Sequence, residues 1–121
     1  MNGSLSRRFG SLALLLLAVW VGTQALQAWS RDRLGNDAAA LAAPGDIQMI
    51  SSLTCPYCAE ARAWFTEYRV PYTECFIERD AACDSRFNAL LSPGTPVLVV
   101  RGQRQVGFDA QRVVKALRPS T

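Results

Sequence analysis

Residues 50–65 read ISSLTCPYCAEARAWF and place two cysteines where an apolar run gives way to helical spacing. Pro56 suits the first position of a helix, because the N–H that proline lacks has no helical partner there. Cys55 is therefore expected at the helix start, where free N–H groups and the helix dipole stabilise a thiolate. Cys58 lies one turn further in. The pair is predicted to be a reactive dithiol in which Cys55 attacks a disulfide and Cys58 resolves the mixed disulfide.

Short apolar runs and amphipathic stretches alternate around this motif, which is typical of an α/β domain. The predicted strands cover residues 47–51, 72–77, 96–100 and 104–108. The first predicted helix begins at Pro56 and is ended by Pro71. The second has an apolar face formed by Cys83, Phe87, Leu90 and Leu91, and the third follows a cap at Asp109. The predicted order is β-α-β-α-β-β-α, without an internal repeat.

The composition narrows the possible chemistry. The 121 residues suffice for one small domain plus an appendage. The sequence contains no histidine, which excludes Ser-His-Asp and Cys-His arrangements and zinc sites that depend on imidazole. A net charge of only +3, with arginines spread along the chain, argues against nucleic acid as a partner. Cysteine is therefore the side chain best suited to nucleophilic work near neutral pH.

Residues 1–30 form an apolar segment in which Arg7 and Arg8 are the only charged side chains. They are predicted to be a membrane segment, either a retained single-pass anchor or a signal peptide cleaved near the small residues Ala25 and Ala28. A retained anchor is favoured, because the charge-free stretch exceeds a typical signal core. The positive charges before the segment predict that the C-terminal domain lies on the exported side of the membrane, and cleavage would instead make that domain secreted.

Residues 31–45 show no sustained amphipathic pattern and end in Pro44-Gly45. They are predicted to be a tether with a partly helical, alanine-rich middle. The domain itself is predicted over residues 46–121. Four cysteines in so short a chain also suit an oxidising, exported location, where disulfides persist.

CPYC at a strand-to-helix turn, Thr95-Pro96 before a buried strand, and VGFD at 106–109 together resemble the glutaredoxin family. The likeness covers about residues 46–118. It implies a thioredoxin-like fold with a four-stranded mixed sheet and helices on both faces, here preceded by one N-terminal apolar helix. It also implies a cis peptide bond before Pro96, no bound cofactor, and glutathione as co-substrate.

The same resemblance implies roles for individual residues. Pro56 and Tyr57 would complete the catalytic motif, although Tyr57 as an aromatic cover of the loop is an equal alternative. The candidate residues for binding substrate or glutathione are Thr54, Thr95, Pro96, Gly107, Phe108 and Asp109. Ser52 departs from the family, which usually carries Lys or Arg there to bind a glutathione carboxylate.

Other readings of the dithiol stay open. An exported protein-disulfide reductase or isomerase would use the same two cysteines without glutathione, and a catalytically silent tethered binding module would keep only the fold. A four-cysteine zinc site is disfavoured, because Cys75 and Cys83 do not form a second close pair. A copper chaperone is disfavoured because Leu53 stands where such proteins carry methionine. Metal is therefore not expected.

Cys75 and Cys83 allow three interpretations. They lie in a predicted strand and near the start of the following helix, with a short connection that permits a structural disulfide. Free buried thiols and a second redox relay are the alternatives, because spacing alone does not fix the distance between two cysteines.

Overall fold

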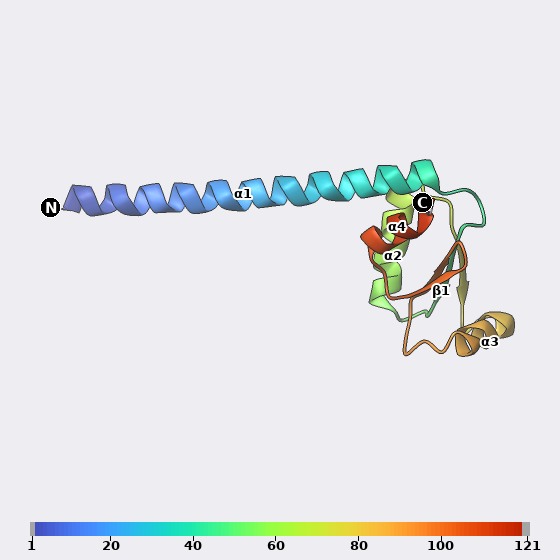
Figure 1. Ribbon diagram of the computed structural model, residues 1–121. Coiled ribbons are helices and arrows are strands. Elements are labelled where there is room, and N and C mark those ends of the chain that lie inside the picture. The colour runs from blue at the N-terminus through green and yellow to red at the C-terminus, as the bar shows by residue number, and fades with distance from the viewer. Residues whose placement is uncertain (1, 120–121) are drawn as a thin grey trace. The chain divides into compact units, whose positions relative to one another are not determined.

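The computed structural model describes residues 2–119. Its helices are α1 (Asn2–Leu41), α2 (Pro56–Glu67), α3 (Ala81–Ala89) and α4 (Ala110–Leu117), and its strands are β1 (Ile47–Ser51), β2 (Thr73–Phe76), β3 (Val97–Val100) and β4 (Gln103–Val106). From β1 onward this is the predicted order (Figure 1). The chain divides into two compact units, residues 1–32 and residues 33–121, which are described separately.

The four strands form one mixed sheet in the order β2-β1-β3-β4. β1 runs parallel to β2 and antiparallel to β3, and β3 and β4 form an antiparallel hairpin. Ser51 lies opposite Phe76, Ile50 opposite Val97, and Val97 opposite Val106. The ends of β1, β2 and β4 and the start of β3 therefore meet at one end of the sheet, and the loops attached there are neighbours.

The main hydrophobic core lies between one face of the sheet and helices α2 and α4. Side chains alternate along β1, so Ile47 and Met49 point into this core while Ile50 points to the opposite face. Phe65 of α2 is fully buried and stacks on Tyr72 with a ring-centroid distance of 4.7 Å. The other buried residues of this core include Ala61, Trp64, Leu98, Val100, Val113, Val114 and Leu117.

The opposite face of the sheet is covered by α3 and has a smaller core. Ile50, Cys83 and Val97 are its buried residues, with Phe87 partly buried against them. Leu91 was predicted on the same apolar helix face, but the structure corrects this. The helix ends at Ala89, and Leu91 adopts a left-handed conformation (φ 53°) that leaves its side chain 83% exposed.

The segment predicted to be a tether differs from that prediction in the structure. α1 continues to Leu41, and its last turns pack on the main core, with Ala38 fully buried. Gly35 is buried too, and a Cβ atom there would overlap the Tyr68 ring. Small residues allow this close approach of helix and ring. Only the short connection from residue 42 to 46 remains outside regular structure.

Arg101, in the turn between β3 and β4, joins three segments of this unit. Its guanidinium donates hydrogen bonds to the Leu41 carbonyl (2.9 Å), the Asp46 carboxylate (3.2 Å) and the Leu117 carbonyl. Its backbone N–H donates to the Asp46 carbonyl at 2.8 Å. Since the last carbonyls of a helix have no partner inside it, one side chain satisfies the ends of both α1 and α4.

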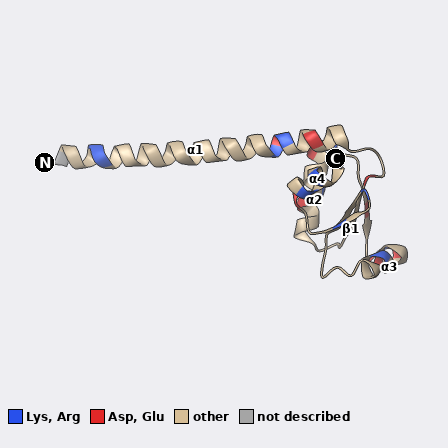
Figure 2. Cartoon of the chain, in the orientation of Figure 1, with Lys and Arg blue, Asp and Glu red and all other residues tan. Residues whose placement is uncertain are grey.

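In the unit of residues 1–32, the described residues form the first part of α1, and their described side chains are exposed. Figure 2 shows uncharged ribbon between the basic band near the N-terminus and the next charged residues. Among the described residues, this is the helix long and apolar enough to cross a membrane. A signal sequence near an N-terminus has the same properties, so the helix is weak evidence for an anchor.

Candidate dithiol site

The CPYC turn begins α2 as the sequence predicts. Cys55 is the N-cap residue, with extended backbone angles (φ −95°, ψ 109°), and Pro56 occupies the first helical turn. The Cys55 Sγ accepts a hydrogen bond from the Cys58 N–H at 3.1 Å. The two sulfurs form a disulfide, with their Cα atoms 5.2 Å apart. Cys58 is fully buried whereas Cys55 is partly accessible, so Cys55 is the sulfur that an external molecule reaches first.

The surface around the disulfide is partly apolar. Tyr57 is 67% exposed and Leu53 is 47% exposed. Thr54, which lies between Leu53 and Cys55 in the sequence, is exposed as well. An exposed ring is compatible with both interpretations of Tyr57, as a contact surface beside the dithiol and as an aromatic cover of the loop.

Two further loops of the predicted site meet each other. The Thr95–Pro96 peptide bond is cis, Pro96 is buried and Thr95 is partly exposed. The Pro96 carbonyl accepts a hydrogen bond from the Gly107 N–H at 2.8 Å. Gly107 has φ 78°, a conformation that favours glycine, so the strand predicted over 104–108 ends at Val106 and turns. This turn and Pro96 lie at the end of the sheet that carries Cys55.

Phe108 and Asp109 have structural contacts in this state. The Phe108 ring packs against Trp64 and Phe65 at centroid distances of 5.4 and 5.7 Å. Asp109 is the N-cap of α4 and accepts a hydrogen bond from the Arg112 N–H at 3.2 Å. Phe108 thus packs on α2, the helix that Cys55 begins.

Glu78 is a residue of this region that the sequence did not single out. Its carboxylate accepts hydrogen bonds from the Ser52 hydroxyl and from the Leu53 N–H (3.2 Å). The Ser52 hydrogen bond is the main cause of a lowered pKa of Glu78. A contact across 26 residues leaves no periodic signal in the sequence. Ser52, where the resemblance to glutaredoxins led us to expect a cation, is therefore next to an anion.

A second carboxylate lies behind the loop. Glu74 of β2 accepts hydrogen bonds from Ser51 Oγ at 2.6 Å and from Arg62 Nε and Nη2 at 2.9 and 2.7 Å. Burial is the largest single influence and raises the pKa of Glu74, but the hydrogen bonds from Arg62 and Ser51 and the charge of Arg62 outweigh it, so the pKa is lowered. This network ties α2 to β1 and β2 at Ser51, the last residue of β1 before the loop that leads to Cys55.

The remaining cysteines are joined as well. Cys75 of β2 and Cys83 of α3 form a disulfide with Cα atoms 6.0 Å apart. Arg86 Nη2 lies 3.3 Å from Cys75 Sγ, and Arg86 Nη1 donates to Gln48 Oε1 at 3.3 Å. Of the three interpretations left open by the sequence, the structure therefore has the bonded one. Within residues 2–119 no three Cys, Asp or Glu side chains gather as a set of metal ligands.

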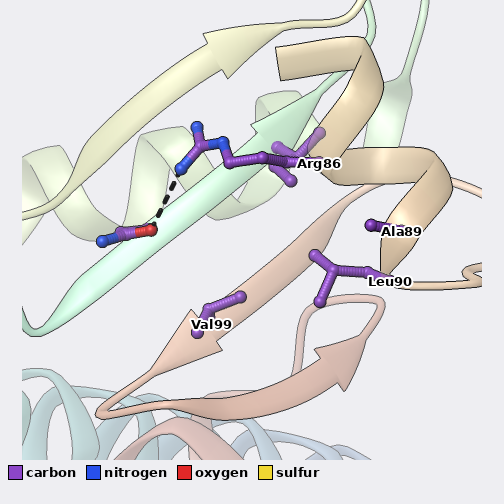
Figure 3. Close-up of a pocket in the computed structure, with 6 residues that line it drawn as sticks. Arg86, Ala89, Leu90 and Val99 are labelled. Carbon is purple, nitrogen blue, oxygen red and sulfur yellow. Dashed lines mark hydrogen bonds between the residues drawn. The ribbon is translucent and has the colours of Figure 1, made fainter. Parts of the chain in front are cut away.

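A hollow of about 190 Å³ lies on the α3 face of the sheet. It is lined by Gln48, Ile50, Arg86, Ala89, Leu90 and Val99. Figure 3 shows Arg86 reaching from α3 over β1 toward the glutamine, with Leu90 and Val99 facing the space. Neither Cys55 nor Cys58 lines this hollow, so it is separate from the dithiol site.

Comparisons with known proteins agree with this geometry. Residues 47–105 match the family model described as glutaredoxin. A mutant of the thioredoxin-like protein BC3987 is 26% identical, with a TM-score of 0.55 over 60% of this chain and 95% of that chain. No curated protein matches the sequence.

Two glutaredoxin structures are similar in fold. The glutaredoxin of Archaeoglobus fulgidus is 16% identical, with a TM-score of 0.51 over 61% of this chain and 87% of that chain. A buckwheat glutaredoxin, solved as a complex with glutathione, is 20% identical, with a TM-score of 0.51 over 78% of this chain and 88% of that chain. At these identities the likeness shows the thioredoxin-like fold alone.

Proposed function

We propose that this protein, whose residues 47–105 match the glutaredoxin family model and contain a Cys-x-x-Cys pair, is a thiol–disulfide oxidoreductase that reduces disulfides at a membrane surface with Cys55 as nucleophile. The observation that carries the proposal is the placement of this pair. Cys55 caps α2 and is partly accessible, whereas Cys58 is buried one turn further along the helix. The Cys58 N–H donates a hydrogen bond to the Cys55 sulfur. A helix N-terminus stabilises a thiolate at that position.

The proposed reaction begins with the reduced pair. The Cys55 thiolate attacks one sulfur of a substrate disulfide and forms a mixed disulfide, and the other substrate sulfur leaves as a thiol after protonation. Cys58 then loses its proton and attacks the Cys55 sulfur, so the second substrate sulfur leaves as a thiol. The substrate gains two electrons, and the pair becomes the disulfide present in the structure.

Glutathione is the proposed source of the electrons. One glutathione thiolate attacks the Cys55–Cys58 disulfide and forms a mixed disulfide on Cys55, and a second releases it as glutathione disulfide. The proposed binding residues remain those of the sequence analysis, namely Thr54, Thr95, Pro96, Gly107, Phe108 and Asp109, and Tyr57 is exposed. The support is their position, because the three loops that carry them are attached to one end of the sheet.

We also propose that residues 1–30 hold the enzyme at a membrane with its domain on the exported side. The support is a helix long and apolar enough to span a bilayer, with two arginines before it. The bonded state of all four cysteines suits an oxidising compartment. Release of the domain after signal cleavage is the alternative, and N-terminal sequencing of protein recovered from the producing cells distinguishes the two.

The test is reduction of a small glutathione mixed disulfide by glutathione, catalysed by the detergent-solubilised full chain. The wild type and Cys58→Ser are compared, with Cys55→Ser as the inactive control. Turnover by the wild type and by Cys58→Ser is expected, because the monothiol step needs Cys55 alone. Loss of turnover in Cys58→Ser would assign the reaction to the dithiol route.

A second candidate function is favoured by Ser52 and Glu78. An anion at the loop opposes a bound glutathione carboxylate, which leaves an exported protein-disulfide reductase or isomerase that does not use glutathione. Silence of the wild type with glutathione, together with exchange against a protein disulfide, would select this function. Silence in both assays would leave a tethered binding module.

A further inference from the structure

The turn between β2 and α3 runs along the loop that leads to Cys55. Ser51 and Phe76 are neighbours across the parallel pair β1 and β2, and the Ile77 N–H continues the pairing by donating to the Ser51 carbonyl at 3.0 Å. Glu78 is the next residue along this turn. Its carboxylate therefore faces residues 52–53, where it accepts the hydrogen bonds described above.

The loop brings this carboxylate close to the reactive sulfur. The Cys55 N–H donates to the Ser52 carbonyl at 3.4 Å, which closes a turn from residue 52 to residue 55. The Cα atoms at the two ends of such a turn lie within about 7 Å of each other. Because Ser52 is hydrogen-bonded to Glu78, the carboxylate lies on the order of 10 Å from the Cys55 sulfur.

The charges around the loop leave this carboxylate dominant. Arg62 is paired with Glu74 at 2.7 Å, so these two charges largely cancel. Arg79, next to Glu78 in sequence, lies over the Phe76 ring at 5.5 Å and offsets part of the negative charge. Glu60 is exposed on α2 and adds another anion.

The second disulfide holds Glu78 in place. Cys75 and Cys83 enclose the seven residues between them, and Glu78 is one of these. Asp80 caps α3 within the same segment by accepting hydrogen bonds from the N–H groups of Ala82 and Cys83. The Glu78 carboxylate therefore lies on a short loop whose two ends are joined by the disulfide.

We propose that Glu78, held by the Cys75–Cys83 loop, is a specificity-determining residue that favours disulfides with neighbouring cationic groups over anionic ones such as glutathione mixed disulfides. The preferred substrate is a polypeptide disulfide flanked by Lys or Arg. The inference rests on the proposed function in one respect, that Cys55 is the attacking sulfur. A carboxylate near that sulfur attracts cations and repels anions, and the effect weakens as salt shortens the Debye length.

The decisive experiment measures the local charge without requiring catalysis. In detergent-solubilised, full-length Cys58→Ser protein with the Cys75–Cys83 disulfide intact, Cys55 is the one free thiol. Its thiolate reacts with methanethiosulfonate reagents, forming a disulfide and expelling methanesulfinate. The ratio of rates for a quaternary-ammonium reagent and a sulfonate reagent reports the potential at Cys55, because the two share one reacting group.

Replacing Glu78 by Gln should lower this ratio about fourfold at low ionic strength. A unit charge about 10 Å away in a water-like medium changes each rate by about twofold, in opposite senses. Asp84→Asn on α3 is the matched control, since it removes the same charge from another exposed site and should leave the ratio unchanged. Cys75→Ser/Cys83→Ser should move the ratio toward the Glu78→Gln value.

An unchanged ratio in Glu78→Gln, or an equal shift in Asp84→Asn, would overturn the proposal. A full wild-type ratio after loss of the second disulfide would overturn the role given to that loop. The catalytic arm compares kcat/KM for a glutathione mixed disulfide and for a lysine-flanked peptide disulfide, with Glu78→Gln expected to favour the former. A wild type without any exchange would refute the proposed function, while the reagent ratio would still decide the role of Glu78.

Discussion

The two faces of the sheet are held by different means. On the face of α2 and α4, the core is made by packed aromatic and aliphatic side chains, with Phe65 at its centre. On the opposite face, the nine-residue helix α3 packs on few buried side chains. The Cys75–Cys83 disulfide joins α3 to β2, and Arg86 lines a hollow between α3 and the sheet. Hydrophobic packing thus stabilises the part of the domain that carries the dithiol, whereas a disulfide stabilises the loop that carries Glu78.

The largest expected effect separates the two faces directly. Phe65→Ala should lower the free energy of unfolding by about 3–5 kcal/mol, because a fully buried aromatic ring leaves a large cavity. Phe87→Ala, on the partly covered face, should cost less than half as much. Guanidinium denaturation of the detergent-solubilised chain measures both, and equal losses would show that the two cores carry similar weight.

Removing the second disulfide should have the next largest effect. Cys75→Ala/Cys83→Ala should lower the free energy of unfolding by about 2.5 kcal/mol, because the unfolded chain gains the freedom of the closed loop. Hydrogen exchange should rise in α3 and stay low in α2. A uniform rise across both helices would contradict the contrast between the two faces.

A smaller effect is expected from Gly35→Ala. The added methyl group would overlap the Tyr68 ring and push the last turns of α1 away from the core, at a cost of about 1–2 kcal/mol. Asn36→Ala is the control, since Asn36 is exposed on the same helix. Greater stability in Gly35→Ala than in Asn36→Ala, measured by denaturation, would mean that residues 33–41 do not pack on the domain.

The smallest effect concerns pH and the polar edge of the packed face. The pKa of Glu74 is lowered in the folded protein, so its contribution to stability is present above the ordinary glutamate pKa and is lost as the pH falls through the folded-state value. Glu74→Gln should therefore flatten the loss of stability below about pH 5, by less than about 1 kcal/mol. Denaturation midpoints at pH 7 and pH 3.5 test this, and an unchanged slope would assign the acid sensitivity to other carboxylates.

The order of elements from β1 onward was predictable because it depends on local patterns. Pro56 and Asp109 mark helix starts by their own chemistry, and alternating apolar residues mark strands. Leu91 was misplaced because its apolar character continues the helix pattern, whereas the backbone leaves the helix two residues earlier.

Contacts between distant residues were beyond the sequence. Gly35 and Ala38 give no amphipathic signal, yet their small size is what lets α1 approach Tyr68. The sequence showed that Ser52 stands where a cationic residue was expected. Its hydrogen bond to Glu78 was not predictable, because this contact depends on how two loops meet at the end of the sheet. The cysteine pair was predicted because CPYC is a local motif, and its electrostatic surroundings were not.

If the proposed anchor holds the domain at its N-terminal end, the contacts of Arg101 have a mechanical consequence. A pull on the chain before residue 33 reaches the domain through the last turns of α1, whose final carbonyl is bound by Arg101. The same guanidinium is also bonded to Asp46 and to the end of α4, so the load is shared between three segments in parallel. Under the proposed anchoring, tension along α1 would therefore have to break this cluster before it reaches β1 and the cysteine turn.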